Sequence, residues 1–129
     1  MGIVVLKPAG TEEEFARLAG QRHYSIGRHS DNDIVIIPFY TGVSRFHCDI
    51  QVSPESVRVL DKSSSYGTYV NDVQIEPRVP RELVDGDRLR FGRHFELDVV
   101  IQGNGDELDE ANNTKTTVGD KLLSLFGLR

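Results

Sequence analysis

An alternation of apolar and polar residues with a period of two is the feature that most constrains the fold of this chain. Cys48, Ile50 and Val52 share one face of an extended segment, and the residues between them are polar. Side chains of a β-strand point alternately to opposite faces, so this pattern predicts a strand with one buried face. The same alternation recurs at Arg88–Phe91 and Phe95–Val99.

Short segments rich in β-branched and aromatic residues continue this pattern, and turn-forming pairs such as Asp85-Gly86 separate them. Many short strands with frequent turns predict an all-β fold, built as an antiparallel sandwich or barrel. The additional strand candidates are Ile3–Leu6, His23–Arg28, Asp33–Ile37, Ser56–Leu60 and Thr68–Val70.

Three segments depart from the strand pattern. Thr11–Leu18 opens with an N-cap residue and has Glu14 three positions later, which predicts either a short helix or a solvated loop. Residues 103–119 are polar and rich in Gly, Asn and Thr, which predicts a flexible linker. Residues 120–129 gather apolar side chains and predict a short C-terminal helical tail that needs a partner surface. The expected domains are therefore a sandwich at 1–102, the linker and the tail.

The composition excludes several classes of protein. A formal net charge of -5 argues against general affinity for nucleic acid, which depends on basic residues. Apolar residues make up 38% of the chain, and no apolar run approaches the ~20 residues of a membrane span. The N-terminal segment lacks the features of a secretory leader. We therefore expect a cytoplasmic protein with no membrane contact.

The cysteine and histidine content indicates no metal site and no cofactor. The single cysteine, Cys48, cannot form an internal disulfide and lies on the apolar face of its predicted strand, so we expect it to be buried. The four histidines, at positions 23, 29, 47 and 94, lack the close spacing of zinc ligands.

Three short clusters lie between the predicted strands, where the loops of a sandwich gather at its ends. The first is Gly27-Arg28, the second is Ser44-Arg45-Phe46-His47, and the third is the hydroxyl-rich segment Ser63–Asn71. A phosphate monoester is bound by guanidinium forks, hydroxyl donors and backbone N–H groups. The clusters supply the first two of these, which predicts a phosphate site.

The order of these motifs resembles a forkhead-associated (FHA) domain. The pattern runs from Gly27-Arg28 through Ser44-Arg45-x-His47 to Ser64-x-x-Gly67-Thr68-x-Val70-Asn71, and ends with Asp85-Gly86-Asp87 before Leu89-Arg90-Phe91-Gly92. The resemblance covers about residues 3–101. It implies an antiparallel β-sandwich of about eleven short strands, of the FHA/SMAD-like kind, whose loops bind phosphothreonine peptides in signalling and which is not an enzyme.

The resemblance also implies a role for each matching residue. Arg28 would be the main phosphate ligand, Ser44 a hydroxyl donor to the same phosphate, and Arg45 an assisting residue. Ser65 would add a further hydroxyl. The residues implied to shape the loops are Gly27, His47, Ser64, Gly67 and Asn71.

Tyr66 is the departure from the family pattern, which usually has asparagine there to contact the peptide backbone. A tyrosine hydroxyl can donate a hydrogen bond but lacks the paired donor and acceptor of an amide. The alternative interpretation is therefore an FHA-fold scaffold with weak or lost phosphate binding, which contacts partners through another face or through the C-terminal tail.

An enzyme is the least supported interpretation. Ser44, His47 and Asp61 could form a catalytic triad on paper, but the chain has no Gly-x-Ser-x-Gly nucleophile elbow. The partners implied by the resemblance are phosphothreonine proteins, including substrates of a Ser/Thr kinase. Thr117, with Asp120 three residues later, raises the further hypothesis that the phosphorylated tail binds its own domain or a second copy.

Overall fold

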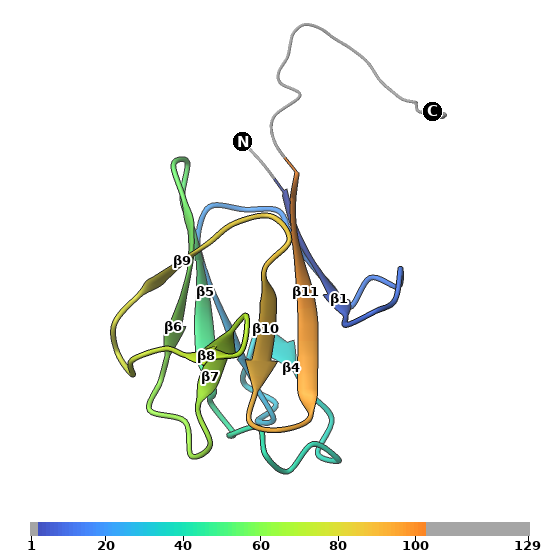
Figure 1. Cartoon of the computed structure of the whole chain (residues 1–129), viewed down its shortest axis with the longest axis vertical. Coiled ribbons are helices and arrows are strands. Elements are labelled where there is room, and N and C mark those ends of the chain that lie inside the picture. The colour runs from blue at the N-terminus through green and yellow to red at the C-terminus, as the bar shows by residue number, and fades with distance from the viewer. Residues whose placement is uncertain (1–2, 103–129) are drawn as a thin grey trace, which may run out of the picture. The chain divides into compact units, whose positions relative to one another are not determined.

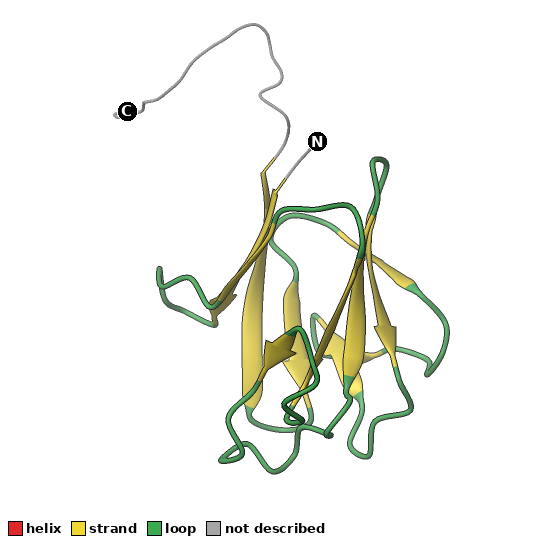
Figure 2. Ribbon diagram, turned by 180° about the vertical axis from the view of Figure 1, so that it is seen from behind, coloured by secondary structure: helices red, strands yellow, loops and turns green. Residues whose placement is uncertain are grey.

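Eleven β-strands and no helix form residues 3–102, the part of the chain that the computed structural model describes (Figures 1 and 2). The strands form two sheets. The order in the first sheet is β2 (Ala16–Leu18), β1 (Ile3–Pro8), β11 (Phe95–Gln102), β10 (Arg88–Phe91), β7 (Thr68–Val70) and β8 (Val73–Gln74). The order in the second sheet is β4 (Ile34–Val35), β3 (His23–Gly27), β5 (Cys48–Val52), β6 (Val57–Asp61) and β9 (Arg81–Leu83).

The period-two pattern buries one face of each central strand. Cys48 and Ile50 on β5 are fully buried, and so are Val59 on β6, Leu89 on β10 and Leu97 on β11. These side chains belong to one hydrophobic cluster to which both sheets contribute. Burial of each large apolar side chain contributes about 1.5–3 kcal/mol, so this cluster is the main source of stability. The sandwich expected from the sequence is confirmed over the described residues.

The central strands lie where the alternation predicted them. Arg88–Phe91 forms β10 over the expected residues, and Thr68–Val70 forms β7. The segment expected at Asp33–Ile37 is shorter, because only Ile34–Val35 pairs with β3, and it does so in parallel. The three strands without a sequence prediction, β2, β8 and β9, are all edge strands of two or three residues.

The short helix considered for Thr11–Leu18 is wrong. The backbone N–H and the hydroxyl of Thr11 both donate to the Pro8 carbonyl, at 3.1 and 2.9 Å, and close a turn. The backbone N–H of Phe15 donates to the Leu6 carbonyl at 2.7 Å, which leads the chain into β2. A threonine that caps its own turn gives the backbone an alternative to a helix. The first half of the segment is the solvated loop, and its second half is a strand.

The predicted linker at 103–119 and the predicted helical tail at 120–129 lie outside the described residues. Val4–Ile101 forms one compact unit by itself. Within residues 3–102 no helix is long or apolar enough to cross a membrane. In the same part of the chain, no three His, Cys, Asp or Glu side chains gather where they could hold a metal ion.

Four loops gather at one end of the sandwich, the lower end in Figure 1. The register places them there, because Cys48 at the start of β5 pairs with Ile26 on β3 and with Asp61 on β6. Phe91 at the end of β10 likewise pairs with the first residues of β7 and β11. The four loops span residues 28–33, 36–47, 62–67 and 92–94. This end of the sandwich, here called the loop end, holds the three clusters found in the sequence.

Candidate functional site

The backbones of two loops meet directly at Gly27, the last residue of β3. A Cβ atom at this position would overlap the carbonyl group of Arg45 and lie 2.9 Å from the side-chain nitrogen of Asn32. Two backbone hydrogen bonds join the loops just beyond it, from Arg28 N–H to the Ser44 carbonyl at 3.2 Å and from His29 N–H to the Arg45 carbonyl at 3.1 Å. Only glycine allows this approach, which places Arg28 beside Ser44.

The side chain of Arg28 is held at one end and available at the other. Its Nε–H donates to the backbone carbonyl of Val43, which fixes the plane of the guanidinium group. Within residues 3–102 its two terminal nitrogens make no hydrogen bond and no ion pair, although the side chain is half-buried. A fixed guanidinium fork with two available N–H edges is a geometry suited to a phosphate.

Hydroxyl groups from two further loops join this arginine. The Ser44 hydroxyl accepts a hydrogen bond from the backbone N–H of Ser65 at 3.0 Å, so it links the second loop to the third. Since a hydroxyl that accepts one bond still has a hydrogen to donate, Ser44 can also bind an anion. Ser65 itself is exposed. The structure therefore brings Arg28, Ser44 and Ser65 together from three separate loops.

His47 ties the same loops together from inside. It is fully buried, and its Nδ1 accepts the backbone N–H of Ser44 at 3.0 Å. Nδ1 must therefore lack a hydrogen, so Nε2 carries it and donates to the Gly67 carbonyl at 3.1 Å. The ring also packs against Phe91, with 4.9 Å between ring centroids. These are the contacts of a neutral histidine that braces the loops.

The ionisation of His47 predicts a pH dependence of stability. Burial lowers the pKa of the ring below its ordinary value of 6.5, against the opposing effects of the Gly67 carbonyl and the Asp61 charge. As the pH falls, His47 is therefore protonated at a higher pH in the unfolded chain than in the folded chain. The free energy of unfolding should show no His47 contribution to its pH dependence above about pH 7.5, and should fall as the pH drops below about 6.5.

Urea unfolding of the wild type and of His47→Asn at about pH 7.5 and about pH 5 measures this effect. The wild type should lose more stability between the two pH values than the variant, which has no group to protonate at this position. Equal losses would mean that His47 is not the group responsible.

Asp61 shapes the third loop, and the sequence did not assign it that role. Its carboxylate is 1% exposed and accepts the Ser64 backbone N–H at 3.1 Å, the Ser64 hydroxyl at 2.5 Å and the Thr68 hydroxyl at 2.6 Å. Ser64 in turn accepts the N–H of Gly67, which has a φ of 89°. An acid at the end of a strand, followed by serines and a glycine, was the available signal.

Ser44, His47 and Asp61, which the sequence offered as a catalytic triad, do not form one. Both ring nitrogens of His47 are occupied by backbone groups, and the Ser44 hydroxyl is bonded to the backbone of Ser65. The Asp61 carboxylate is bonded to Ser64 and Thr68 instead of the imidazole. A nucleophile needs a hydrogen bond to its base, and this arrangement provides none.

Asn32 is a second site-shaping residue that sequence reasoning missed. Its buried side-chain amide donates to the carbonyls of His29 at 2.8 Å and Arg45 at 2.7 Å. It therefore holds the first loop against the second. No local pattern marks this asparagine, because both partners become neighbours only after folding.

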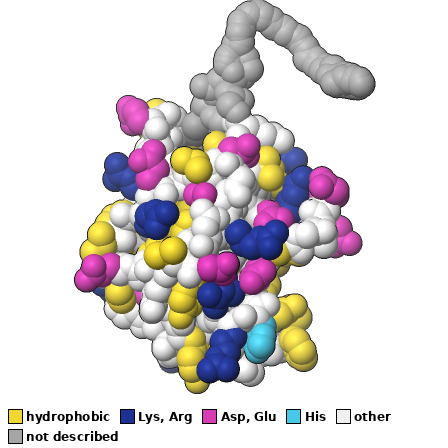
Figure 3. Space-filling model, in the orientation of Figure 1, with side chains coloured by type: hydrophobic (Ala, Val, Ile, Leu, Met, Phe, Trp, Pro, Cys, Tyr) yellow, Lys and Arg dark blue, Asp and Glu magenta, His cyan; other side chains and the backbone are white. Residues whose placement is uncertain are grey.

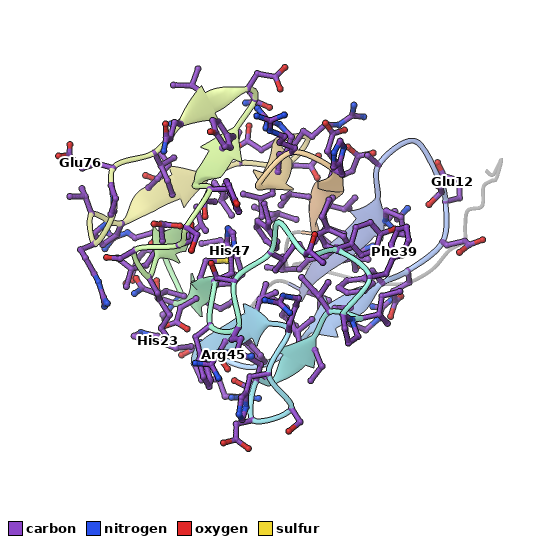
Figure 4. The ribbon with its side chains drawn as sticks, turned by 90° about the horizontal axis from the view of Figure 1, so that it is seen from below. Glu12, His23, Phe39, Arg45, His47 and Glu76 are labelled. Carbon is purple, nitrogen blue, oxygen red and sulfur yellow. The ribbon has the colours of Figure 1, made fainter. Side chains whose placement is uncertain are left out.

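The remaining predicted residues lie in different places. Arg45 is exposed at the loop end, below His47 in the view of Figure 4, and within residues 3–102 its guanidinium group forms no ion pair. Tyr66 is 59% exposed and lines a pocket of about 380 Å³ that also includes Arg93. Asn71 is not part of this site: it follows β7 at the opposite end and bonds to Asp87 at 2.9 Å.

The FHA domain family profile matches residues 24–92, which is more than half of the chain. An FHA domain-containing protein of Arabidopsis thaliana is 41% identical over 69 residues, covering 52% of this chain and 4% of that protein. The glycogen accumulation regulator GarA of Mycobacterium tuberculosis is 34% identical over 76 residues, covering 59% of this chain and 44% of GarA.

A solved structure extends the likeness to three dimensions. It comes from a structural and functional analysis of phosphothreonine-dependent FHA domain interactions, with a TM-score of 0.66 and 28% identity, and it covers 80% of this chain and 99% of its own. This chain spans only 4% and 44% of the lengths of the two curated relatives. The family match falls on β3 to β10 and on the loops that carry Arg28, Ser44 and Ser65. The chain belongs to the FHA domain family.

Proposed function

We propose that this chain recognises phosphothreonine in partner proteins and thereby mediates phosphorylation-dependent protein–protein interaction in signalling. The observation that carries the proposal is the meeting of Arg28, Ser44 and Ser65 from three loops. Family membership and the phosphothreonine-dependent interactions of the solved FHA structure support it.

Each residue then has a defined part in binding. The terminal N–H groups of Arg28 bind two phosphate oxygens, and the Ser44 hydroxyl donates to the phosphate. Ser65 adds a second hydroxyl, and Arg45 supplies a further positive charge near the phosphate. Each charge-assisted hydrogen bond contributes about 1.5–3 kcal/mol, so two or three supply much of the ~8 kcal/mol of micromolar binding.

Binding requires little rearrangement of the loops. Nδ1 of His47 holds the backbone of Ser44, while Gly67 receives hydrogen bonds from His47 and from the N–H of Gly92 at 3.0 Å. The loops are thus fixed before a peptide arrives, which lowers the entropic cost of binding.

We propose that the partners are substrates of a Ser/Thr kinase. The cytoplasmic location and the self-interaction of a phosphorylated Thr117 stay predictions.

Three oriented peptide libraries, with a central phosphothreonine, phosphoserine or unmodified threonine, test the proposed function. The protein should retain the phosphothreonine library and exclude the unmodified one. The phosphoserine library should bind more weakly by about 1 kcal/mol, the value of one buried methyl group.

The scaffold alternative has one observation in its favour, which is the exposed Tyr66 in place of the family's asparagine. Under that alternative, phosphatase treatment of a partner leaves its binding to this chain unchanged. Under the proposed function, the same treatment abolishes binding.

A further inference from the structure

A second pocket opens at the loop end beside the one lined by Tyr66. It has a volume of about 230 Å³, and its walls include four aromatic side chains: Phe39, Tyr40, Phe91 and Phe95. The rings of Phe39 and Tyr40 meet edge to face at 5.2 Å, and Tyr40 meets Phe95 in the same way at 4.8 Å. Most of the pocket surface is therefore apolar and aromatic. We call it the aromatic pocket.

Phe39 makes this pocket unusual for a folded domain. Its side chain is 79% exposed, the largest exposed fraction among the large exposed hydrophobic residues of the described chain. Figure 4, which views the loop end from below, shows Phe39 on the right of the molecule, and Figure 3 shows hydrophobic side chains beside basic ones at the lower end. Exposed apolar surface rimmed by polar residues is typical of an interaction site.

The aromatic pocket adjoins the Tyr66 pocket. Thr41, Gly42 and His94 line both of them. The shared floor exists because the backbones of two loops touch: a Cβ atom on Gly92, which has a φ of 68°, would lie 2.6 Å from the Gly42 carbonyl oxygen. The two pockets therefore adjoin each other where the second and fourth loops meet, and together we call them the depression.

Along the chain, the Tyr66 pocket lies next to the proposed phosphate site. Tyr66 directly follows Ser65, whose N–H is bonded to the Ser44 hydroxyl. A peptide held by its phosphate at Arg28 and Ser44 can pass over Tyr66 and enter the depression. The adjacency of the two sites favours the same peptide as the occupant of both.

We propose that the aromatic pocket binds an apolar side chain of the phosphothreonine peptide itself, and that Phe39 determines this preference. The proposal rests on the proposed function and adds a substrate class to it: peptides with phosphothreonine and a nearby branched aliphatic, methionine or aromatic residue. Such a side chain removes the exposed surface of Phe39 from water. A carboxylate in the same place would be desolvated beside aromatic rings without a partner, so acidic residues are disfavoured there.

The test begins with the phosphothreonine library, degenerate at four positions on each side, applied to the wild type. One position should select Leu, Ile, Met or Phe. Two phosphopeptides that differ only by Leu or Ala at that position are then titrated against the wild type and Phe39→Ala. The wild type should bind the Leu peptide about tenfold more tightly than the Ala peptide, and Phe39→Ala should reduce this ratio to about twofold.

Ile37→Ala is the matched control. Ile37 is an exposed apolar residue of the same loop, 60% exposed, and it does not line the aromatic pocket. This variant should keep the tenfold ratio. Phe39→Glu, which places a negative charge at the rim, should lower the ratio below that of Phe39→Ala. Thermal unfolding of each variant verifies that the domain is folded.

The possible outcomes separate this proposal from the proposed function. Phosphate-dependent binding with no apolar preference at any position overturns the pocket assignment and leaves the function standing. The same conclusion follows if Phe39→Ala keeps the tenfold ratio. The absence of any phosphate-dependent binding overturns both.

Discussion

Replacement of Arg28 by alanine is expected to weaken binding of a phosphothreonine peptide by at least about 100-fold. The variant loses two charge-assisted hydrogen bonds from the terminal guanidinium nitrogens, each worth about 1.5–3 kcal/mol, and each 1.4 kcal/mol is a factor of ten in affinity. Because the Nε–H of Arg28 is held by the Val43 carbonyl, the guanidinium group is already oriented in the free protein. Isothermal titration calorimetry with the best library peptide measures the change.

Two further variants show that geometry and position matter, not charge alone. Arg28→Lys keeps the positive charge but loses the planar fork, and it should recover only part of the affinity. Arg58→Ala removes an exposed arginine from β6, with the same change in net charge, and should leave the affinity unchanged. If Arg28→Ala and Arg58→Ala bound the peptide equally well, Arg28 would not be the phosphate ligand.

Replacement of His47 by alanine is expected to reduce the free energy of unfolding by about 3–5 kcal/mol, a large part of the 5–15 kcal/mol of an ordinary domain. The fully buried ring leaves a cavity against Phe91, and the Ser44 N–H loses its acceptor. The Gly67 carbonyl loses the hydrogen bond from His47 but keeps the one from the N–H of Gly92. Urea denaturation at about pH 7.5, where the ring is neutral in both states, gives the value.

His47→Asn and His23→Ala are the controls for this loss. An asparagine oxygen can accept the Ser44 N–H but its side chain is too short to span to Gly67, so an intermediate loss is expected. His23 is exposed on β3, and its replacement should change stability by less than about 0.5 kcal/mol. A loss below about 1 kcal/mol for His47→Ala would contradict the bracing role.

The sequence predicted the central part of the fold because burial there follows strand periodicity. Cys48, Ile50 and Val52 alternate without interruption, and they are buried as expected. The edge strands β2, β8 and β9 were missed because each has only two or three residues and at most one of them is β-branched or aromatic, whereas all three residues of the equally short β7 are. At Thr11, the local capping pattern suggested a helix, but the pairing of β2 with β1 decided the structure of the second half of that segment.

The residues that we propose as phosphate ligands could be identified from the sequence because they lie in short motifs that stay local in the folded chain. Gly27-Arg28 and Ser44-Arg45 were both identified from the sequence, and the two loops contact each other. Asn32 and the aromatic pocket could not be found in this way. Asn32 acts on carbonyls that folding brings to it, and the pocket combines side chains from the second loop with Phe91 and Phe95. Such sites are created by topology instead of local pattern.

The most direct test of the account is a calorimetric titration of this chain with one library-selected phosphothreonine peptide, before and after phosphatase treatment of the peptide. We expect a dissociation constant in the micromolar range, about 8 kcal/mol of binding free energy, for the phosphorylated peptide and no measurable binding after treatment. Equal affinity for the two forms, or no binding of either by the folded protein, would contradict the claim that this FHA domain reads phosphothreonine.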